Sequence, residues 1–456
     1  MDLTTEQIAD QRATDMGATD LAEYSDMNPA IGQKVVEVEP TQQQFDEILA
    51  HYQAGHLEEV ERLALAITKD FPHHQFGWGV LVALFQQLGR IEEALLPAKK
   101  IVRLLPNDPS ARDTLGTVLH EMGRLKEAEE SYRSSLSLEP SCARTHFNLG
   151  ITLRSQDRLQ DAAEAYRKAI NLHPDFAQAH NNLGNLLRGF GEFSDAEKHF
   201  ARAIEIQPGF ATAHNNLGVT LQALRKFNDA ENCFRRALAI APDYLEACGN
   251  LADVVRDQGR LDEAAALYRQ LIELAPGLPE AHYNLAVTLN ELGRVMEARD
   301  SYYAAISLSG DFAEAHYNLG NIERDLRNLA EAEENYLRAV SIRSDYMEAH
   351  ANLGNLRREL GRLDDSESSY KAALELESNS PLLHYNLGVT QQEQGRYLDA
   401  EKSYKKALSL DFDFKAPHVQ LGSLLLLQGK HKEGLTLLRQ SQGAIVFDKD
   451  TWVTVY

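Results

Sequence analysis

The chain has 456 residues, enough for about three ordinary domains, with 43% hydrophobic and 25% charged residues and a formal net charge of −22. This charge argues against nucleic acid and anionic membrane surfaces as partners, because both are bound through Lys and Arg. No segment approaches the roughly 18 consecutive apolar residues of a spanning helix, so we expect no membrane insertion.

The first 40 residues differ in composition from the rest. They hold nine acidic, two basic and one aromatic residue, which predicts a disordered acidic leader over 1–40. The opening MDLTTEQIADQRATD lacks a basic stretch followed by an apolar one, so we expect no secretory signal peptide. The three cysteines, Cys142, Cys233 and Cys248, are too scattered for a disulfide framework and fit a reducing compartment. We therefore expect a soluble, cytoplasmic protein.

From residue 41 onward the sequence repeats with a period of 34 residues and no insertion or deletion. The heptapeptides AHNNLGN at 179–185, AHYNLGN at 315–321 and AHANLGN at 349–355 mark the register. Positions 1–34 are counted below from the start of each repeat. The repeats begin at residues 41, 75, 109, 143, 177, 211, 245, 279, 313, 347, 381 and 415.

Each repeat predicts two helices joined by a turn. Positions 4, 7, 8 and 11 form an apolar or small stripe with the spacing of one helix face, as HNNLGNLL at 180–187 illustrates. Gly near position 15 ends many first helices, and Pro at position 32 closes the second helix as far as Pro276. Because position 20 is small and position 24 is aromatic, we expect the two helices to approach closely with the ring beside them.

This pattern resembles the tetratricopeptide repeat, a family of 34-residue helix–turn–helix units. The resemblance covers about nine-tenths of the chain. It implies an all-α fold, a right-handed α-α superhelical solenoid of about twelve repeats over residues 41–448. Repeats of this kind stack because one repeat cannot bury its own apolar face.

The end of the repeat region departs from the pattern. The repeat at 415 carries Gly434 at position 20 and Leu438 at position 24, which is typical of a capping repeat. A C-terminal tail, 449–456, follows. We expect the β-branched, apolar segment 443–456 to fold back on the last helix pair or to meet a partner.

Histidine takes the place of the family's position-4 Trp, which is present only as Trp78. A metal array would need several imidazoles on one ion, but packed helices lie about 8–10 Å apart and zinc holds its nitrogens at about 2.0–2.1 Å. Eight equally spaced copies do not suit a catalytic site either. We expect no metal, no cofactor and no catalytic histidine, with each polar tip bonded to backbone, side chain or water. The eight are His146, His180, His214, His282, His316, His350, His384 and His418.

Asparagine recurs on a different face of the first helix. At 100° per residue, position 6 lies off the apolar stripe and shares a face with positions 2, 9 and 13, which lines the concave groove in the tetratricopeptide family. The row resembles the asparagine ladder in the repeat arm of O-linked N-acetylglucosamine transferases, which grips the backbone of extended polypeptides. Position 6 supplies Asn148, Asn182, Asn216, Asn250, Asn284, Asn318, Asn352 and Asn386, and position 9 adds Asn185, Asn321 and Asn355.

A carboxamide can pair with a peptide N–H and C=O together, so this row is a candidate peptide-binding site. The structural alternative is that each amide bonds only to a neighbouring helix. Acidic residues flank the row from residue 245 onward, with Glu280, Glu314 and Glu348 at position 2 and further acids at position 13. We expect the 245–393 half to favour Lys/Arg-bearing segments, unless these acids form only a solvated surface.

The favoured function is a non-catalytic protein–protein interaction scaffold that binds extended polypeptide segments in its groove. The sequence contains no GxxxxGK[ST], HExxH or GxSxG, and eight residues follow the last repeat, so we expect no nucleotide-sugar domain and no enzyme activity. One alternative is the substrate-recruiting arm of a separately encoded or missing glycosyltransferase. Another is a scaffold that self-associates through its end repeats.

Overall fold

The computed structural model of the chain describes residues 39–442, 445–446 and 454–455. Nearly all of the predicted leader, 1–40, and most of the predicted tail, 449–456, lie outside the described residues. The chain divides into two compact units, an N-terminal unit, Met1–Ala241, and a C-terminal unit, Pro242–Tyr456. A continuous solenoid over 41–448 stays a prediction.

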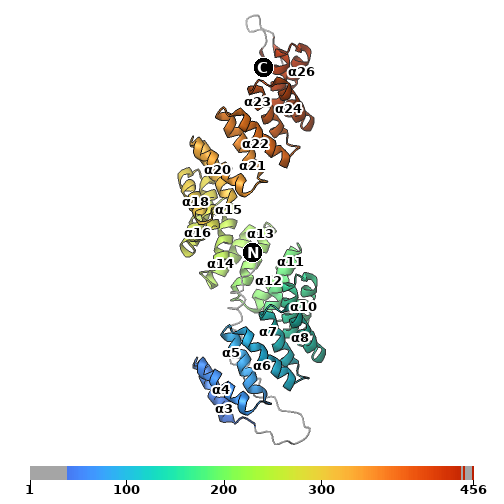
Figure 1. Ribbon diagram of the computed structural model, residues 1–456, viewed down its shortest axis with the longest axis vertical. Coiled ribbons are helices and arrows are strands. Elements are labelled where there is room, and N and C mark those ends of the chain that lie inside the picture. Colours follow the sequence, from blue (N-terminus) through green and yellow to red (C-terminus); the bar gives the residue numbers. More distant parts are fainter. Residues whose placement is uncertain (1–38, 443–444, 447–453, 456) are drawn as a thin grey trace. The chain divides into compact units, whose positions relative to one another are not determined.

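The described part of the N-terminal unit is built from helices that pair in chain order (Figure 1). They are α3 Gln42–Gln53, α4 Leu57–Asp70, α5 Gln75–Gln87, α6 Ile91–Leu104, α7 Pro109–Glu121, α8 Leu125–Leu138, α9 Ala143–Ser155, α10 Leu159–Leu172, α11 Ala177–Gly189, α12 Phe193–Ile206, α13 Ala211–Ala223 and α14 Phe227–Ile240.

The C-terminal unit continues the same alternation. Its helices are α15 Leu245–Asp257, α16 Leu261–Leu274, α17 Pro279–Glu291, α18 Val295–Leu308, α19 Ala313–Asp325, α20 Leu329–Ile342, α21 Met347–Glu359, α22 Leu363–Leu376, α23 Pro381–Glu393, α24 Tyr397–Leu410, α25 Lys415–Leu427 and α26 His431–Gln442. Each predicted repeat therefore holds one helix pair, which confirms the all-α prediction. Among the described residues, no helix combines the length and apolar character needed to cross a membrane.

Within a repeat, the two helices meet where a small residue faces an aromatic ring. A Cβ placed on Gly320 of α19 would lie 2.8 Å from Cδ1 of Tyr336, and one on Gly150 would lie 2.6 Å from Cε1 of Tyr166. Both rings are fully buried. The close approach expected from the small and aromatic positions is confirmed, because a full side chain at position 8 would displace the ring.

The turn between paired helices requires a left-handed residue at position 15. Gly supplies it in most repeats, as at Gly395, where φ is 77°. Where Gly is missing, Asp157, Arg225 and Arg327 adopt the same conformation, with φ of 60°, 58° and 67°. The turn geometry is therefore kept even where the side chain disfavours it.

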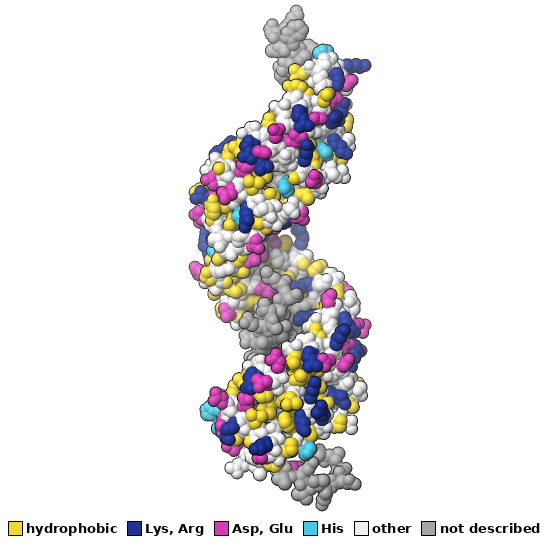
Figure 2. All heavy atoms as spheres, in the orientation of Figure 1, with side chains coloured by type: hydrophobic (Ala, Val, Ile, Leu, Met, Phe, Trp, Pro, Cys, Tyr) yellow, Lys and Arg dark blue, Asp and Glu magenta, His cyan; other side chains and the backbone are white. Residues whose placement is uncertain are grey.

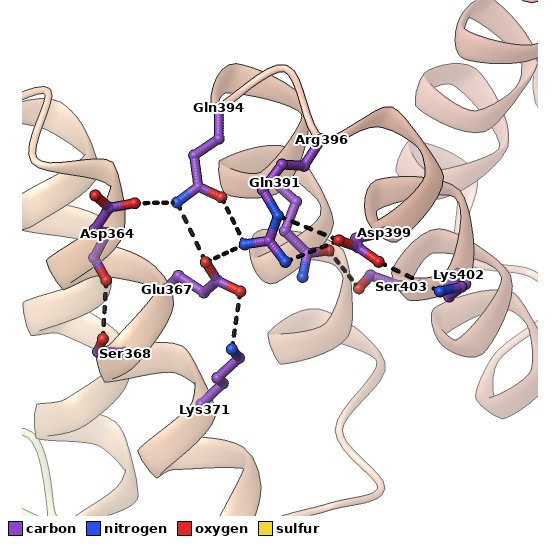
Figure 3. A network of polar contacts seen from close by, with 10 residues as sticks. All are labelled: Asp364, Glu367, Ser368, Lys371, Gln391, Gln394, Arg396, Asp399, Lys402 and Ser403. Atoms are coloured by element: carbon purple, nitrogen blue, oxygen red, sulfur yellow. Dashed lines mark hydrogen bonds and ion pairs between the residues drawn. The ribbon is translucent and has the colours of Figure 1, made fainter.

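Neighbouring repeats in each unit stack through their helices, and ion pairs join consecutive second helices. A base at position 16 pairs with an acid at position 21 of the preceding repeat; Arg396 Nη1, for example, lies 2.6 Å from Glu367 Oε2 (Figure 3). Such pairing suits a surface on which both signs of charge alternate, as on the visible face of each unit (Figure 2). The other pairs of this kind are Arg90–Glu61, Arg158–Glu129, Lys226–Glu197, Arg362–Glu333 and Lys430–Glu401.

The last repeat ends the C-terminal unit differently. Gly434 packs against Gly422 in place of the usual alanine, and the buried Leu438 takes the place of the aromatic ring. Strands β1 Ile445–Val446 and β2 Thr454–Val455 pair antiparallel and both contact α26. For these four residues, the expected return of the tail onto the last helix pair is confirmed.

Candidate functional site

In most repeats, position 4 carries an N–H donor that bonds the backbone carbonyl six residues earlier, at position 32 of the preceding repeat. Trp78 Nε1 donates to Pro72 O at 3.3 Å, and Arg112 Nη2 donates to Pro106 O at 2.8 Å. In seven of the histidines, Nε2 bonds the equivalent carbonyl at 2.7 to 3.2 Å. They are His146, His180, His214, His282, His350, His384 and His418. The prediction that the imidazole tips are bonded is confirmed.

The eighth histidine, His316, bonds a side chain instead, with its Nδ1 2.9 Å from Asn335 Oδ1. In the N-terminal unit, Nδ1 of His180 lies 2.9 Å from Nδ1 of His199. Burial, followed by the neighbouring His180, lowers the pKa of His199 to about 4. Within the described part of the chain, no three His, Cys, Asp or Glu side chains are grouped so that they could hold a metal ion.

In the C-terminal unit, the asparagine row bonds across repeats. Asn318 Nδ2 donates to the Tyr283 hydroxyl at 3.2 Å, and Asn352 Nδ2 donates to the Tyr317 hydroxyl at 3.2 Å. In both cases the acceptor is position 5 of the preceding repeat. Asn352 Nδ2 also lies 2.9 Å from Asn321 Oδ1, so these amides are held in one orientation.

The N-terminal unit has the same cross-repeat bond with other acceptors. Asn216 Nδ2 donates to Asn181 Oδ1 at 3.0 Å, and Asn148 Nδ2 lies 3.5 Å from Asp113 Oδ2. Burial raises the pKa of Asp113, although Arg144 opposes the shift. Asn182 accepts at 3.5 Å from Asn181. The structural alternative, in which an amide bonds to a neighbouring helix, therefore holds for part of the row.

Two members of the row differ from this pattern. Asn284 and Asn386 are half-buried and make no side-chain hydrogen bond to any residue in the described part of the chain. Asn250, in the first repeat of the C-terminal unit, is also half-buried. Replacing Asn284 and Asn386 would thus test a role in binding without removing a contact between helices.

The position-9 asparagines serve mainly as acceptors inside the protein. The hydroxyl of Tyr336 donates to Asn321 Oδ1 at 2.7 Å, and that of Tyr370 donates to Asn355 Oδ1 at 2.6 Å. Asn185 Oδ1 accepts from Arg188 at 3.3 Å. The contacts of Asn321 and Asn355 hold buried rings, which is a structural role.

The flanking acids fall into two groups. Glu280 and Glu348 are exposed at position 2. Glu314 is engaged, because Arg343 Nη1 lies 2.6 Å from its Oε1 while the guanidinium stacks 3.5 Å from the centroid of Tyr346. At position 13, Glu393 pairs at 3.4 Å with Arg358, which stands at position 12 of the preceding repeat.

Position 5 is the site feature that the sequence analysis missed. Its aromatic residues accept the asparagine bonds and pack on the ring at position 34, as in Tyr317 and Tyr346, whose centroids are 4.9 Å apart. Tyr283 pairs with Phe312 in the same way at 4.8 Å. The available signal was the aromatic residue directly before position 6 in several repeats, 35 residues before the asparagine that it contacts.

Comparison with known families agrees with this geometry. Profiles described as tetratricopeptide repeat match residues 109–142, 177–210, 209–277, 255–301, 283–347 and 381–414, and one described as TPR repeat matches 152–188 and 354–395. The chain is a tetratricopeptide repeat protein. Most of its repeats use position 4 to cap the turn, and several use position 6 to join neighbouring first helices.

Several solved structures are similar to parts of this tetratricopeptide repeat protein. YrrB, described as a TPR protein with an unusual peptide-binding site, is 26% identical over 41% of this chain and 96% of its own, with a TM-score of 0.36. MamA is 25% identical over 36% of this chain and 91% of its own, with a TM-score of 0.33. PilF of Pseudomonas aeruginosa is 22% identical over 45% and 94%, with a TM-score of 0.42. No curated protein matches the sequence.

Proposed function

We propose that this tetratricopeptide repeat protein is a non-catalytic interaction scaffold that binds extended polypeptide segments along the asparagine row of its C-terminal unit. The observation that carries the proposal is which hydrogen-bonding groups of the asparagine side chains are already used inside the protein. Asn318 and Asn352 use their Nδ2 groups between helices, and their Oδ1 atoms have no hydrogen-bond partner among the described residues. Asn284 keeps both groups uncommitted among the described residues. Such a row offers acceptors to the N–H groups of a peptide backbone.

The spacing of the row suits an extended ligand. Packed helices lie about 8–10 Å apart, and an extended chain advances about 3.3–3.6 Å per residue, so one asparagine would meet roughly every third residue. Contacts made to the backbone do not read side chains. The proposed scaffold therefore accepts many sequences rather than one motif.

The acidic residues beside the asparagine row would add a preference for basic ligands. Glu280 and Glu348 are exposed beside the row, whereas Glu314 is partly neutralised by Arg343. Exposed acids of this kind attract basic segments and accelerate association more than they add affinity. We therefore propose that the C-terminal unit favours Lys/Arg-bearing segments. The resemblance to the repeat arm of glycosyltransferases stays a prediction, and so does self-association.

The test uses peptides selected for binding to the intact chain from a random-sequence display library. Each selected peptide is remade with its backbone amides N-methylated one at a time, which removes a donor and leaves the side chains unchanged. The proposal expects N-methylation at about every third residue to weaken binding by roughly two- to twelvefold, the value of one hydrogen bond. Alanine substitution of most side chains should matter less. Binding that tolerates N-methylation at every position would rule out recognition through the backbone.

A further inference from the structure

Two neighbouring repeats of the C-terminal unit border an open cavity that the asparagine row does not use. It has a volume of about 560 Å³ and lies between α18, α19 and α20. Its wall includes Tyr303, His316, Leu319, Glu331, Glu334 and Leu337. This volume falls within the range of about 300–1,000 Å³ that is usual for small-molecule pockets. On α19, His316 and Asn318 point about 200° apart around the helix, so the cavity and the asparagine row are on different faces.

Two contacts that recur in many of the other repeats are both missing at the cavity. The carbonyl of Gly310, at position 32, accepts from Arg338 Nη2 at 3.3 Å and leaves His316 without its usual partner. Position 21 is Arg299 instead of an acid, and position 16 of the next repeat is Asn328 instead of a base. The ion pair that joins second helices at several other junctions cannot form here, as it also cannot where position 21 is Leu95, Ala163 or Ala265. Departures from a repeated local pattern concentrate at functional sites.

The hydrogen bonds around His316 determine which of its nitrogens carries the proton. Asn335 Nδ2 donates to the backbone carbonyl of Glu331 at 2.9 Å, so Asn335 Oδ1 is the atom that faces His316. Oδ1 is an acceptor, and His316 Nδ1 must therefore carry the hydrogen. In the neutral ring Nε2 is then an unprotonated acceptor, opposite to the other seven histidines, whose Nε2 donates to a carbonyl.

No donor among the described residues reaches the Nε2 atom of His316. His316 is only 8% exposed, and its Nε2 has no hydrogen-bond partner among the described residues. A buried polar atom without a partner destabilises the folded protein, and a ligand that supplies a donor would recover that free energy.

The charged residues that line the cavity indicate which kind of ligand group would donate to His316 Nε2. Glu331 and Glu334 are both exposed on the first half of α20. Arg338 also lines the cavity, but it donates to Gly310 O. It also lies close to Asp311, whose pKa is lowered by a hydrogen bond from Ser309 and, more weakly, by the Arg338 charge. The acids therefore outweigh the one base, and the ring of Tyr303 with Leu319 and Leu337 supplies apolar surface between them.

We infer that this cavity binds a primary ammonium group carried on an apolar stem. The ammonium donates to His316 Nε2 and to the carboxylates of Glu331 and Glu334, and the stem lies against Tyr303 and the leucines. An ammonium offers three donors and no acceptor, which matches one imidazole acceptor and two acids. A small amine and a lysine side chain of a partner protein share this chemistry.

The test measures binding of three probes to the full chain by titration calorimetry: 2-phenylethylamine, its neutral counterpart 2-phenylethanol, and N-acetyl-lysine methylamide. We expect at least one of the two amines to bind more than tenfold tighter than the alcohol. Binding of 2-phenylethylamine alone identifies a small-molecule site, and binding of the lysine derivative identifies a site for a protein side chain. Equal binding of amine and alcohol, or no binding of either amine, overturns the inference.

Variants locate the binding. His316→Phe, and separately Glu331→Gln with Glu334→Gln, should each weaken amine binding about tenfold or more. The matched control is His350→Phe in the next repeat, because His350 Nε2 is already bonded to Ser344 O at 3.1 Å. Its effect on amine binding should be below twofold.

A second measurement needs no variant and covers the case in which His316→Phe fails to fold. Long-range ¹H–¹⁵N spectra of the unaltered chain should contain one position-4 histidine in the Nδ1–H form, and its Nε2 resonance should move when 2-phenylethylamine is added. If every histidine is in the Nε2–H form, or if the Nδ1–H histidine does not respond, the inference is wrong.

Discussion

At the scale of single residues, the hydrogen bond made at position 4 explains why histidine can replace tryptophan there. What the position requires is an N–H group that reaches the carbonyl six residues earlier. Trp78 Nε1, Arg112 Nη2 and the histidine Nε2 atoms all supply it. The carbonyl belongs to the turn that follows a second helix, where it has no helical partner. The residue type can therefore vary among side chains that supply this donor, although Cys248, at position 4 of its repeat, bonds Leu267 O instead.

His384→Phe should lower the free energy of unfolding by about 0.5–1.5 kcal/mol, because the carbonyl of Ser378 loses the donor that lies 3.0 Å away. His384→Trp should cost less, since Trp78 shows that an indole N–H reaches the equivalent carbonyl. Urea unfolding followed by circular dichroism gives both values. Equal losses for Phe and Trp would mean that ring packing, not the hydrogen bond, sets the stability.

The histidine pair in the N-terminal unit should make stability depend on pH. The folded pKa of His199, about 4, lies below its ordinary value because burial disfavours the charged ring. The unfolded chain then takes up the proton first, so this contribution is present above about pH 6.5 and is lost as the pH falls toward 4. After allowance for partial exposure, the loss is on the order of 1 kcal/mol.

His199→Gln should reduce this loss, and the difference between variant and wild type isolates the pair from the other titrating groups. Urea midpoints at pH 7 and pH 4.5 are the measurement. If the urea midpoint falls equally in both proteins between pH 7 and pH 4.5, the His180–His199 pair is not the cause of the pH dependence.

At the scale of helices, the charged contacts between repeats are unequal. Glu367 of α22 is 6% exposed and accepts from Arg396 at 2.6 Å and Gln394 at 3.2 Å, with Lys371 2.9 Å away (Figure 3). Burial alone would raise the pKa of Glu367, but the bonds from Lys371 and Gln394 and the charge of Arg396 lower it overall. A buried acid with several donors contributes more than an exposed ion pair.

Glu367→Ala should destabilise the C-terminal unit by about 2–3 kcal/mol, because it leaves Arg396 and Gln394 without their shared acceptor. Glu375→Ala, an exposed acid on the same helix, is the control and should change stability by less than about 0.5 kcal/mol. Both are measured by urea unfolding. If both variants lose the same free energy of unfolding, the contacts of Glu367 contribute no more to stability than an exposed charge does.

The turn at Gly310 should open more readily than its neighbours. It lacks the proline of the Pro276 turn, and its carbonyl bonds the exposed Arg338 at 3.3 Å instead of a histidine. Ser344 also lacks proline but keeps the bond from His350. Hydrogen exchange should therefore be fastest around 310, intermediate around 344 and slowest around 276. A different order among the three turns would show that the position-4 bond does not govern their opening.

At the scale of the whole molecule, the period of 34 residues was sufficient to predict the helix pairs, the turns and the buried rings, because each repeat presents the same residue types at the same positions. The bonds between repeats could not be predicted in the same way. Which side chain lies opposite Asn318 depends on how two repeats stack, and the contact to Tyr283 spans 35 residues, not 34. A pattern averaged over all repeats also does not reveal where a single repeat departs from it, as at Gly310 and Arg299.

The same stacking divides the predicted site. Asn321 and Asn355 hold buried tyrosines, whereas Asn284 and Asn386 have no internal side-chain partner within the described residues. Only the second kind can be changed without loosening the fold. This distinction makes the proposed binding role testable apart from stability.

The most direct test of the proposed scaffold function is the affinity of a display-selected peptide for the Asn284→Ala, Asn386→Ala double variant. Two lost amide contacts at about 0.5–1.5 kcal/mol each should weaken binding at least fivefold, with an unchanged urea midpoint. The control pair Asn321→Ala, Asn355→Ala should instead lower the midpoint, because Tyr336 and Tyr370 lose their acceptors. Unchanged affinity in the first variant, at wild-type stability, would contradict the claim that the asparagine row binds polypeptide.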